Sequence, residues 1–220
     1  MRAAPATRAA LTILRTPVAS LCVALALLCA PASLCAARSA DAAAAPATPA
    51  TADGFDEVMH LLAMRRHGRV EFVEQQFLAV LDRPVESSGE LRYDAPDRLE
   101  KRTLQPHPQT LNLAGDVLTV QRGHSRHVLD LHAYPQIQPF VESIRATLAG
   151  DRSALEKIFH VEFAGSVERW TLTLVPIDRQ MAKNVSQVQI DGSKDQLLDV
   201  EIRQPDGDRS VMTLRAIAAP

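Results

Sequence analysis

The fold is indicated most directly by residues 185–217, which read VSQVQIDGSKDQLLDVEIRQPDGDRSVMTLRAI. Three segments of this stretch alternate apolar and polar side chains, as strands with one buried face do: 185–190, 197–202 and 210–217. Asp191-Gly192 and Asp206-Gly207 stand between them. An Asp-Gly pair between alternating runs is a strong signal for a β-hairpin, so this end of the chain predicts a three-stranded antiparallel meander.

Strand patterns also occur on both sides of a central helical region. They lie at 69–81, 89–93, 98–104, 110–113, 117–120 and 127–131 before it, and at 161–163 and 170–176 after it. Short connections such as Ala114-Gly115-Asp116 favour antiparallel pairing of consecutive strands. A sheet of about ten to eleven strands does not stay flat, so we expect a strongly curved sheet or incomplete β-barrel.

Three segments have helical periodicity. The first helix has an apolar stripe of Phe55, Val58, Met59, Leu62 and Ala63. Residues 135–151 form the second helix, which ends at Gly150, and a short third helix follows with Ser153 as its expected cap. Only these stripes can cover the hollow of the sheet. The predicted class is therefore α+β, with helices across the concave face.

The N-terminus has the features of a secretory signal peptide at residues 1–37. Three arginines precede an apolar run from Val18 to Leu28, and small residues continue to a cleavage site near Ala37. Two alternatives remain open. The first is an uncleaved membrane anchor, but the apolar run is shorter than the roughly 20 residues of a membrane span. The second is a lipid-anchored cysteine, but Leu28 and Leu34 precede the candidate cysteines, where lipidation signals have a small residue.

Cleavage would leave an acidic chain without cysteine. The three cysteines all lie before residue 38, and without residues 1–38 the chain has 20 basic and 26 acidic residues, a net charge of −6. This composition argues against disulfides and against nucleic acid as a partner. Residues 38–53 are rich in Ala, Pro and Thr and predict a flexible tether, and residues 54–220 suffice for one domain.

The search for chemistry finds little. Glycine-rich phosphate loops, nucleophile elbows and zinc-protease motifs are absent from the sequence. His124, His127 and His132 lie within nine residues, but a structural zinc site needs a fourth ligand. Asp191, Ser193 and Asp195 resemble only part of a calcium loop. We predict no metal, no cofactor and no catalytic residue.

Several short motifs resemble the LolA family, the carriers that take lipoproteins to the outer membrane. They are Phe72-Val73-Glu74-Gln75, Gly89-Glu90-Leu91-Arg92-Tyr93 with Pro96 and Leu99, Pro106 with Leu111, Ala114-Gly115-Asp116 with Leu118, Trp170-x-Leu172-x-Leu174-x-Pro176, and Ile190-Asp191-Gly192. Together they extend over nearly the whole chain after the tether. One departure is Ala95, because the usual carriers have an arginine before this proline that is associated with lid closure and release.

The resemblance implies an incomplete barrel whose helices form a lid over a hydrophobic cavity for acyl chains. The protein would be a monomeric periplasmic carrier or chaperone, not an enzyme, that moves a lipoprotein or other hydrophobic cargo from an inner-membrane donor to an outer-membrane acceptor. The side chains expected to contact cargo are Phe72, Leu91, Tyr93, Leu118, Val120, Leu129, Leu131, Trp170, Leu172 and Leu174, with Phe140, Ile144 and Leu148 on the lid.

Alternatives stay open for the function and for each of these residues. Each apolar side chain would equally suit an ordinary packed core. The same fold with a filled interior would be a non-enzymatic module in envelope assembly. A hydrolase with a scattered triad is the third alternative, because a triad is defined by geometry rather than by spacing.

Overall fold

The structure is a computed structural model, which describes residues 52–134 and 138–217. The side chains of Ala52, Pro139 and Phe140 are outside the description. The predicted signal peptide and the first 14 residues of the predicted tether also lie outside the described residues. These parts of the domain division remain predictions.

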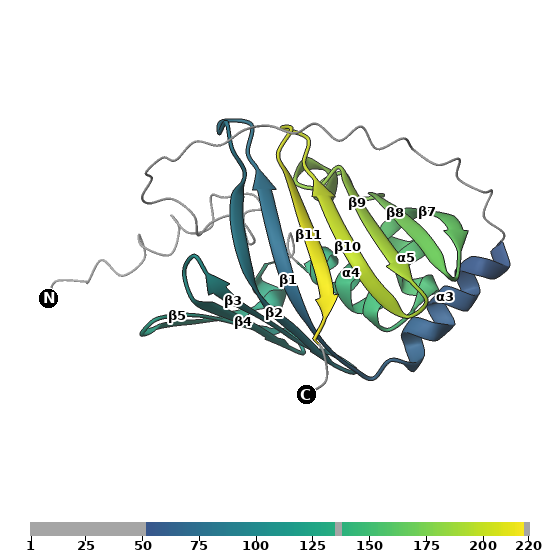
Figure 1. Ribbon diagram of the computed structural model, residues 1–220, viewed down its shortest axis with the longest axis horizontal. Helices are drawn as coiled ribbons and strands as arrows, with labels where there is room; N and C mark the ends of the chain where they lie inside the picture. Colours follow the sequence, from purple (N-terminus) through teal and green to yellow (C-terminus); the bar gives the residue numbers. More distant parts are fainter. Residues whose placement is uncertain (1–51, 135–137, 218–220) are drawn as a thin grey trace, which may run out of the picture.

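The strands form one antiparallel sheet, in which consecutive strands pair within the part before the helical insert and within the part after it (Figure 1). Six strands precede the helical insert: β1 (His67–Phe77), β2 (Val85–Asp94), β3 (Arg98–Gln105), β4 (Gln109–Ala114), β5 (Val117–Arg122) and β6 (Ser125–Asp130). Five follow it: β7 (Phe159–Ser166), β8 (Arg169–Pro176), β9 (Gln187–Ser193), β10 (Gln196–Arg203) and β11 (Arg209–Ala216).

The first and last strands join the two halves of the sheet. β1 pairs with β2 on one side and with β11 on the other, so that Phe72 lies opposite both Gly89 and Leu214. The order is β6-β5-β4-β3-β2-β1-β11-β10-β9-β8-β7, and β6 and β7 are the two edges. The sheet therefore curls without closing into a barrel.

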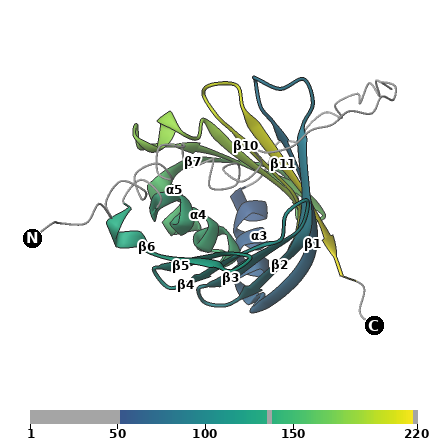
Figure 2. The ribbon, with the colours of Figure 1, turned by 90° about the vertical axis from the view of Figure 1, so that its left-hand side faces the viewer.

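Helices lie in the hollow of the curled sheet, as Figure 2 shows. They are α3 (Ala52–Met64), α4 (Gln138–Leu148) and α5 (Arg152–Ile158), with short 3-10 helices η1 (Leu131–Ala133) and η2 (Met181–Lys183). The predicted α+β class, the curved incomplete barrel and the helices on its concave face are confirmed. None of the helices within the described residues is long and apolar enough to cross a membrane.

Two separate apolar clusters fill parts of the hollow. In the first, the predicted stripe of α3 packs on α5 and on β7–β9, with Leu62, Leu155 and Trp170 at its centre. The second is smaller and consists of Leu113, Leu118, Leu131 and Val141, with half-buried side chains packed around it. α3 and α5 thus close one half of the hollow, and α4 reaches toward the other.

Two sequence predictions are wrong in position. The first strand ends at Phe77 rather than at residue 81, and residues beyond it form a hairpin tip where Val80 is 89% exposed. Asp191-Gly192 lies inside β9, and the turn to β10 is Lys194-Asp195, with Lys194 at φ 54°. Gly192 is required for packing instead, because a Cβ there would overlap the indole ring of Trp170.

Candidate functional site

The concave face of β1–β6 has an apolar floor. Side chains alternate between the two faces of a strand, and cross-strand pairing places the inward residues of neighbouring strands in rows. We call these residues the apolar floor: Leu91, Tyr93, Leu99, Leu111, Leu113, Leu118, Val120 and Leu129. Phe72 on β1 and Leu214 on β11 continue it.

Several residues of this floor remain partly open. Leu113, Leu118 and Tyr93 are buried, whereas Leu91, Val120 and Leu129 are only half-buried. Burial raises the pKa of the Tyr93 phenol, and the charge of Arg66 opposes this effect. Leu131, on η1, is buried in the same cluster as Leu118. Seven of the predicted cargo contacts therefore lie together on or beside the floor: Phe72, Leu91, Tyr93, Leu118, Val120, Leu129 and Leu131.

The other predicted strand contacts lie in the closed half of the hollow. Trp170, Leu172 and Leu174 on β8 are at most 1% exposed and pack in the cluster formed with α3 and α5. The Trp170 Nε1–H donates to the Lys194 carbonyl oxygen at 3.0 Å, which satisfies the only polar atom of this side chain. In this structure these three residues belong to the packed core.

α4 separates the two halves. Ala146 on α4 packs in the cluster with α3, and just beyond the end of the helix a Cβ at Gly150 would overlap the Met59 carbonyl. Val141 joins the smaller cluster on the floor side, and Ile144 and Leu148 are half-buried on the same helix. The predicted lid contact of Phe140 lies outside the described side chains. Val141 is not among the predicted cargo contacts, although it recurs at helical spacing with Ile144 and Leu148.

Arg145 ties α4 to the β4–β5 hairpin. Its Nη2 donates to the Gly115 carbonyl oxygen, and its Nη1 is 3.5 Å from an Asp116 carboxylate oxygen. A weaker contact of 3.7 Å joins Nη1 to Glu142 on the same helix. Within the described residues, the Arg145 Nε is buried without a hydrogen-bond partner. These contacts fasten α4 to the β4–β5 hairpin.

A charged pair lies on the same concave face. The Lys101 ammonium is 2.6 Å from a carboxylate oxygen of Glu74, and the side chains are 13% and 2% exposed. The Ser210 hydroxyl donates to the other Glu74 oxygen at 2.8 Å, and the Ser87 hydroxyl is 3.3 Å from the first. Lys101 Nζ also lies 4.8 Å from the centre of the Phe72 ring. We name Glu74, Lys101, Ser87 and Ser210 the polar station.

The sequence analysis does not predict the polar station, although the alternation of side chains along the strands indicates it. Glu74 follows Phe72 by two residues and Lys101 follows Leu99 by two, so each charge shares the inward face with an apolar neighbour. A charged residue at an inward-facing strand position is unusual. It indicates an oppositely charged or hydrogen-bonding partner on a neighbouring strand.

The convex face is polar. A hollow of about 260 Å³ on this face is lined by Arg92, Asp94, Arg98, Leu99, Glu100, Asn112 and Ala114. Charged walls of this kind do not suit an acyl chain. Among the described residues no group of three His, Asp or Glu side chains is placed to hold a metal ion, and His124, His127 and His132 do not form one.

Comparison with known families identifies the architecture. A family model described as "Outer membrane lipoprotein carrier protein LolA-like" matches residues 43–220. The chain belongs to this LolA-like family. No curated protein matches the chain significantly.

Solved structures resemble this LolA-like chain at low identity. The LolA superfamily protein NE2245 from Nitrosomonas europaea is 12% identical, with 78% of this chain and 96% of that one covered and a TM-score of 0.39. MucB, in the MucA/MucB complex of Pseudomonas aeruginosa, is 14% identical, with 76% and 58% covered and a TM-score of 0.43. LprF from Mycobacterium bovis is 11% identical, with 76% and 92% covered and a TM-score of 0.35. The family match confirms the resemblance that the sequence motifs indicate.

The arginine usual before the proline is replaced by Ala95 in this LolA-like chain. Ala95 lies in the β2–β3 turn, and its N–H donates to the Arg66 carbonyl oxygen at 2.8 Å. This alanine has no side chain that reaches the helices. The arginine that fastens a helix to the sheet here is Arg145, which comes from the helix itself.

Proposed function

We propose that this protein is a periplasmic carrier that binds the acyl chains of a lipoprotein or another hydrophobic cargo and moves it toward the outer membrane. The cargo lies on the apolar floor, between β2–β6 and α4. The protein acts as a monomer and without catalysis. An inner-membrane protein delivers the cargo and an outer-membrane protein receives it. The predicted signal peptide places the domain in the periplasm.

One observation carries this proposal: the two halves of the concave face differ in how they are covered. Leu172 and Leu174 are at most 1% exposed under α3 and α5, whereas Leu91, Val120 and Leu129 on the other half are only half-buried. A row of accessible apolar side chains inside a curved sheet is the expected lining of a hydrophobic ligand site. The cargo contacts therefore concentrate on the floor rather than on β8.

The energetics favour acyl chains as the ligand. Burial of a methylene contributes about 0.8 kcal/mol, so a 16-carbon chain gains on the order of 10 kcal/mol. A carrier must also release this cargo. Release of the Arg145 contacts with the β4–β5 hairpin would free the Val141 end of α4 from the floor, while Ala146 stays packed in the core with α3 and α5.

The second candidate function is the envelope assembly module with a filled interior. The observation that favours it is the dense packing around Trp170, which leaves half of the hollow without room for cargo. In that case the half-buried floor residues would simply be the margin of the core, and the protein would act through its outer surface.

A pair of neighbouring residues on β6 tests the proposal. Leu129 faces the hollow, and Val128, which is 59% exposed, faces the opposite side of the same strand. We would measure binding of a fluorescent acyl probe to the wild type, to Leu129→Asn and to Val128→Asn. The carrier predicts weaker binding for Leu129→Asn by about tenfold, which corresponds to the loss of one apolar contact, and unchanged binding for Val128→Asn.

Two outcomes would contradict the carrier. Equal binding by both variants would place the probe away from the floor, and the absence of probe binding by the wild-type protein would favour the assembly module. A thermal unfolding midpoint for each variant shows that a loss of binding does not reflect a loss of fold.

A further inference from the structure

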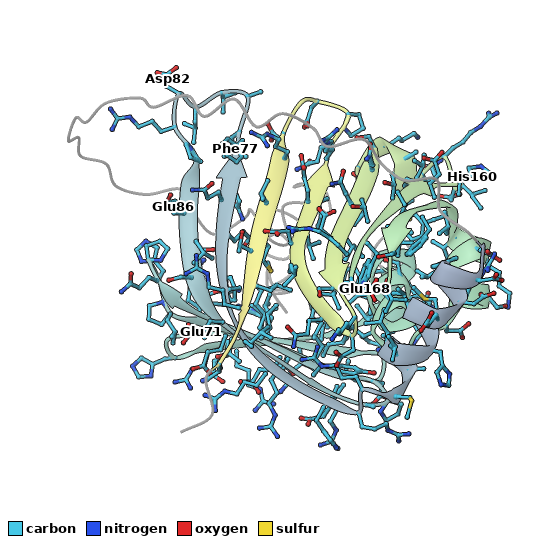
Figure 3. The ribbon with its side chains drawn as sticks, turned by 45° about the vertical axis from the view of Figure 1, so that its right-hand side comes forward. Glu71, Phe77, Asp82, Glu86, His160 and Glu168 are labelled. Carbon is cyan, nitrogen blue, oxygen red and sulfur yellow. The ribbon has the colours of Figure 1, made fainter. Side chains whose placement is uncertain are left out.

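The polar station stands at the border of the apolar floor. Lys101 lies between Leu91 on β2 and Leu111 on β4, both of which belong to the floor. Glu74 lies further along β1, toward the end of the sheet that Phe77 and Asp82 mark in Figure 3. Along this direction the concave face therefore changes from hydrocarbon to a pair of opposite charges and two hydroxyls.

The pair is costly to bury. Two charges lose their hydration here, and an apolar pair of the same volume is often at least as stabilising. All four members of the polar station come from the adjacent strands β1, β2, β3 and β11, which the backbone already joins. A role of this pair in recognising a ligand explains its presence better than a contribution to the stability of the fold.

The two charges differ in accessibility. Glu74 is fixed by the Ser210 and Ser87 hydroxyls as well as by Lys101, and it is only 2% exposed. Lys101 has a long flexible side chain and is 13% exposed, so it is the member that a ligand on the floor reaches first. An ammonium group donates hydrogen bonds and accepts none. The complementary ligand group is therefore an acceptor such as a carbonyl oxygen.

We propose that the polar station binds the head of the cargo, and that the cargo is an uncharged acyl ester or acyl amide whose carbonyl oxygen accepts a hydrogen bond from Lys101. This inference rests on the proposed carrier function. The chain lies on the apolar floor beside α4, and the head points toward the Phe77 end of β1. An amide also offers an N–H donor to Glu74.

The charge balance disfavours a free fatty acid. Glu74 already neutralises Lys101 at 2.6 Å, so a second carboxylate would bring an uncompensated negative charge into a site of low dielectric constant. Esters of glycerol and N-acyl amides share the acceptor and add no charge. The first class represents glycerolipids, and the second represents the acylated terminus of a lipoprotein.

A series of ligands with one chain and different heads tests this inference. Monopalmitoylglycerol, palmitoylethanolamide and palmitate would each displace a fluorescent monoacylglycerol from the full-length protein at neutral pH. We expect the ester and the amide to displace it at a concentration at least about tenfold lower than palmitate, because the palmitate carboxylate adds an uncompensated charge. Whichever of the ester and the amide is stronger indicates the source of the cargo.

The matched variants are two double substitutions, one on β1 and β3 and the other on β1 and β2. Glu74→Gln with Lys101→Met removes the station without leaving an isolated charge, and Arg69→Met with Glu90→Gln removes a convex ion pair of 2.8 Å. We expect the first double variant to bind all three ligands within about threefold of one another, and the second to keep the wild-type preference.

The outcomes separate this inference from the function on which it rests. Equal displacement by all three heads, a preference for palmitate, or an unchanged preference in the Glu74/Lys101 double variant would overturn the head-group site and leave the carrier standing. The absence of any probe binding by the wild type would overturn both.

Discussion

The indole ring of Trp170 on β8 covers Gly192 on β9 so closely that no side chain fits at residue 192. The same indole donates its N–H to the Lys194 carbonyl oxygen at 3.0 Å, just beyond the end of β9. Gly192 and the following turn therefore hold the largest side chain of the core in a fixed position. This arrangement closes the half of the hollow that lies under α3.

Gly192→Ala is expected to destabilise the protein by about 2 kcal/mol, because an added methyl group in a packed core forces side chains and backbone to move. Urea unfolding followed by Trp170 fluorescence measures this change. Gly68→Ala is the control, since a Cβ there would meet only the flexible end of Arg65 at 3.3 Å. Equal stability of Gly192→Ala and the wild type would show that the indole does not occupy this position.

Arg145→Met should release α4 from the β4–β5 hairpin, because it removes the hydrogen bond to Gly115 and the contact with Asp116. Hydrogen bonds of charged groups contribute about 1.5–3 kcal/mol. We expect hydrogen exchange of α4 amides to accelerate by roughly tenfold or more while α3 is unchanged. Arg152→Met, which breaks the ion pair of α5 with Asp56 at 2.7 Å, should loosen α5 instead. Unchanged exchange in α4 would refute its fastening by Arg145.

Lys101→Met alone should cost about 3 kcal/mol of unfolding free energy, because it leaves the Glu74 charge buried without its partner. Adding Glu74→Gln should restore most of this loss. A double-mutant cycle by urea unfolding measures the coupling. The exposed pair of Arg69 and Glu90 should show a coupling below about 1 kcal/mol. A similarly small coupling between Glu74 and Lys101 would mean that the pair is solvated rather than buried.

The Asp130 carboxylate should titrate below the usual range of aspartate. The His132 backbone N–H donates to it at 3.0 Å, and the His132 ring adds a second bond, so the pKa of Asp130 is lowered. A lowered pKa in the folded state stabilises the fold above the unfolded value of about 3.9, and this stabilisation is lost as the pH falls through the folded pKa. The His132 amide shift in an NMR titration should therefore have its midpoint below about 3.9. A midpoint at or above this value would show that Asp130 does not accept this hydrogen bond from the His132 N–H.

Periodicity and turn chemistry predict most of the architecture. Four of the five residues in the predicted α3 stripe are buried because their spacing follows the helical repeat, namely Phe55, Val58, Met59 and Leu62, whereas Ala63 is exposed. Gly150 ends α4 with a φ of 64°, which confirms its predicted place. The short helix α5 is capped by Asp151 rather than Ser153, since the Asp151 side chain accepts from the Ala154 N–H. Local signals therefore identify an element more reliably than its end residue.

Long-range features could not be predicted from local patterns. The pairing of β1 with β11 joins residues more than 130 positions apart, and no turn signal connects them. The local pattern of Asp191-Gly192 predicts a turn, but the contact of Gly192 with Trp170 depends on the pairing of β8 with β9 and places this glycine inside a strand. The polar station combines residues from four strands in the same way. Alternation along the strands gives the same prediction for all inward-facing apolar residues. The structure divides them between a closed core and a half-buried floor.

The position of bound cargo tests the account most directly. A palmitoyl ester with a photoreactive diazirine in its chain would be bound to the full-length protein and irradiated, and the labelled residues would be identified by peptide mass spectrometry. The account predicts labels on the apolar floor and α4, at residues such as Leu91, Leu129 and Ile144, all of which are half-buried. Labels confined to exposed convex residues such as Val73 and Val128, or no label that an excess of unlabelled ester displaces, would contradict it.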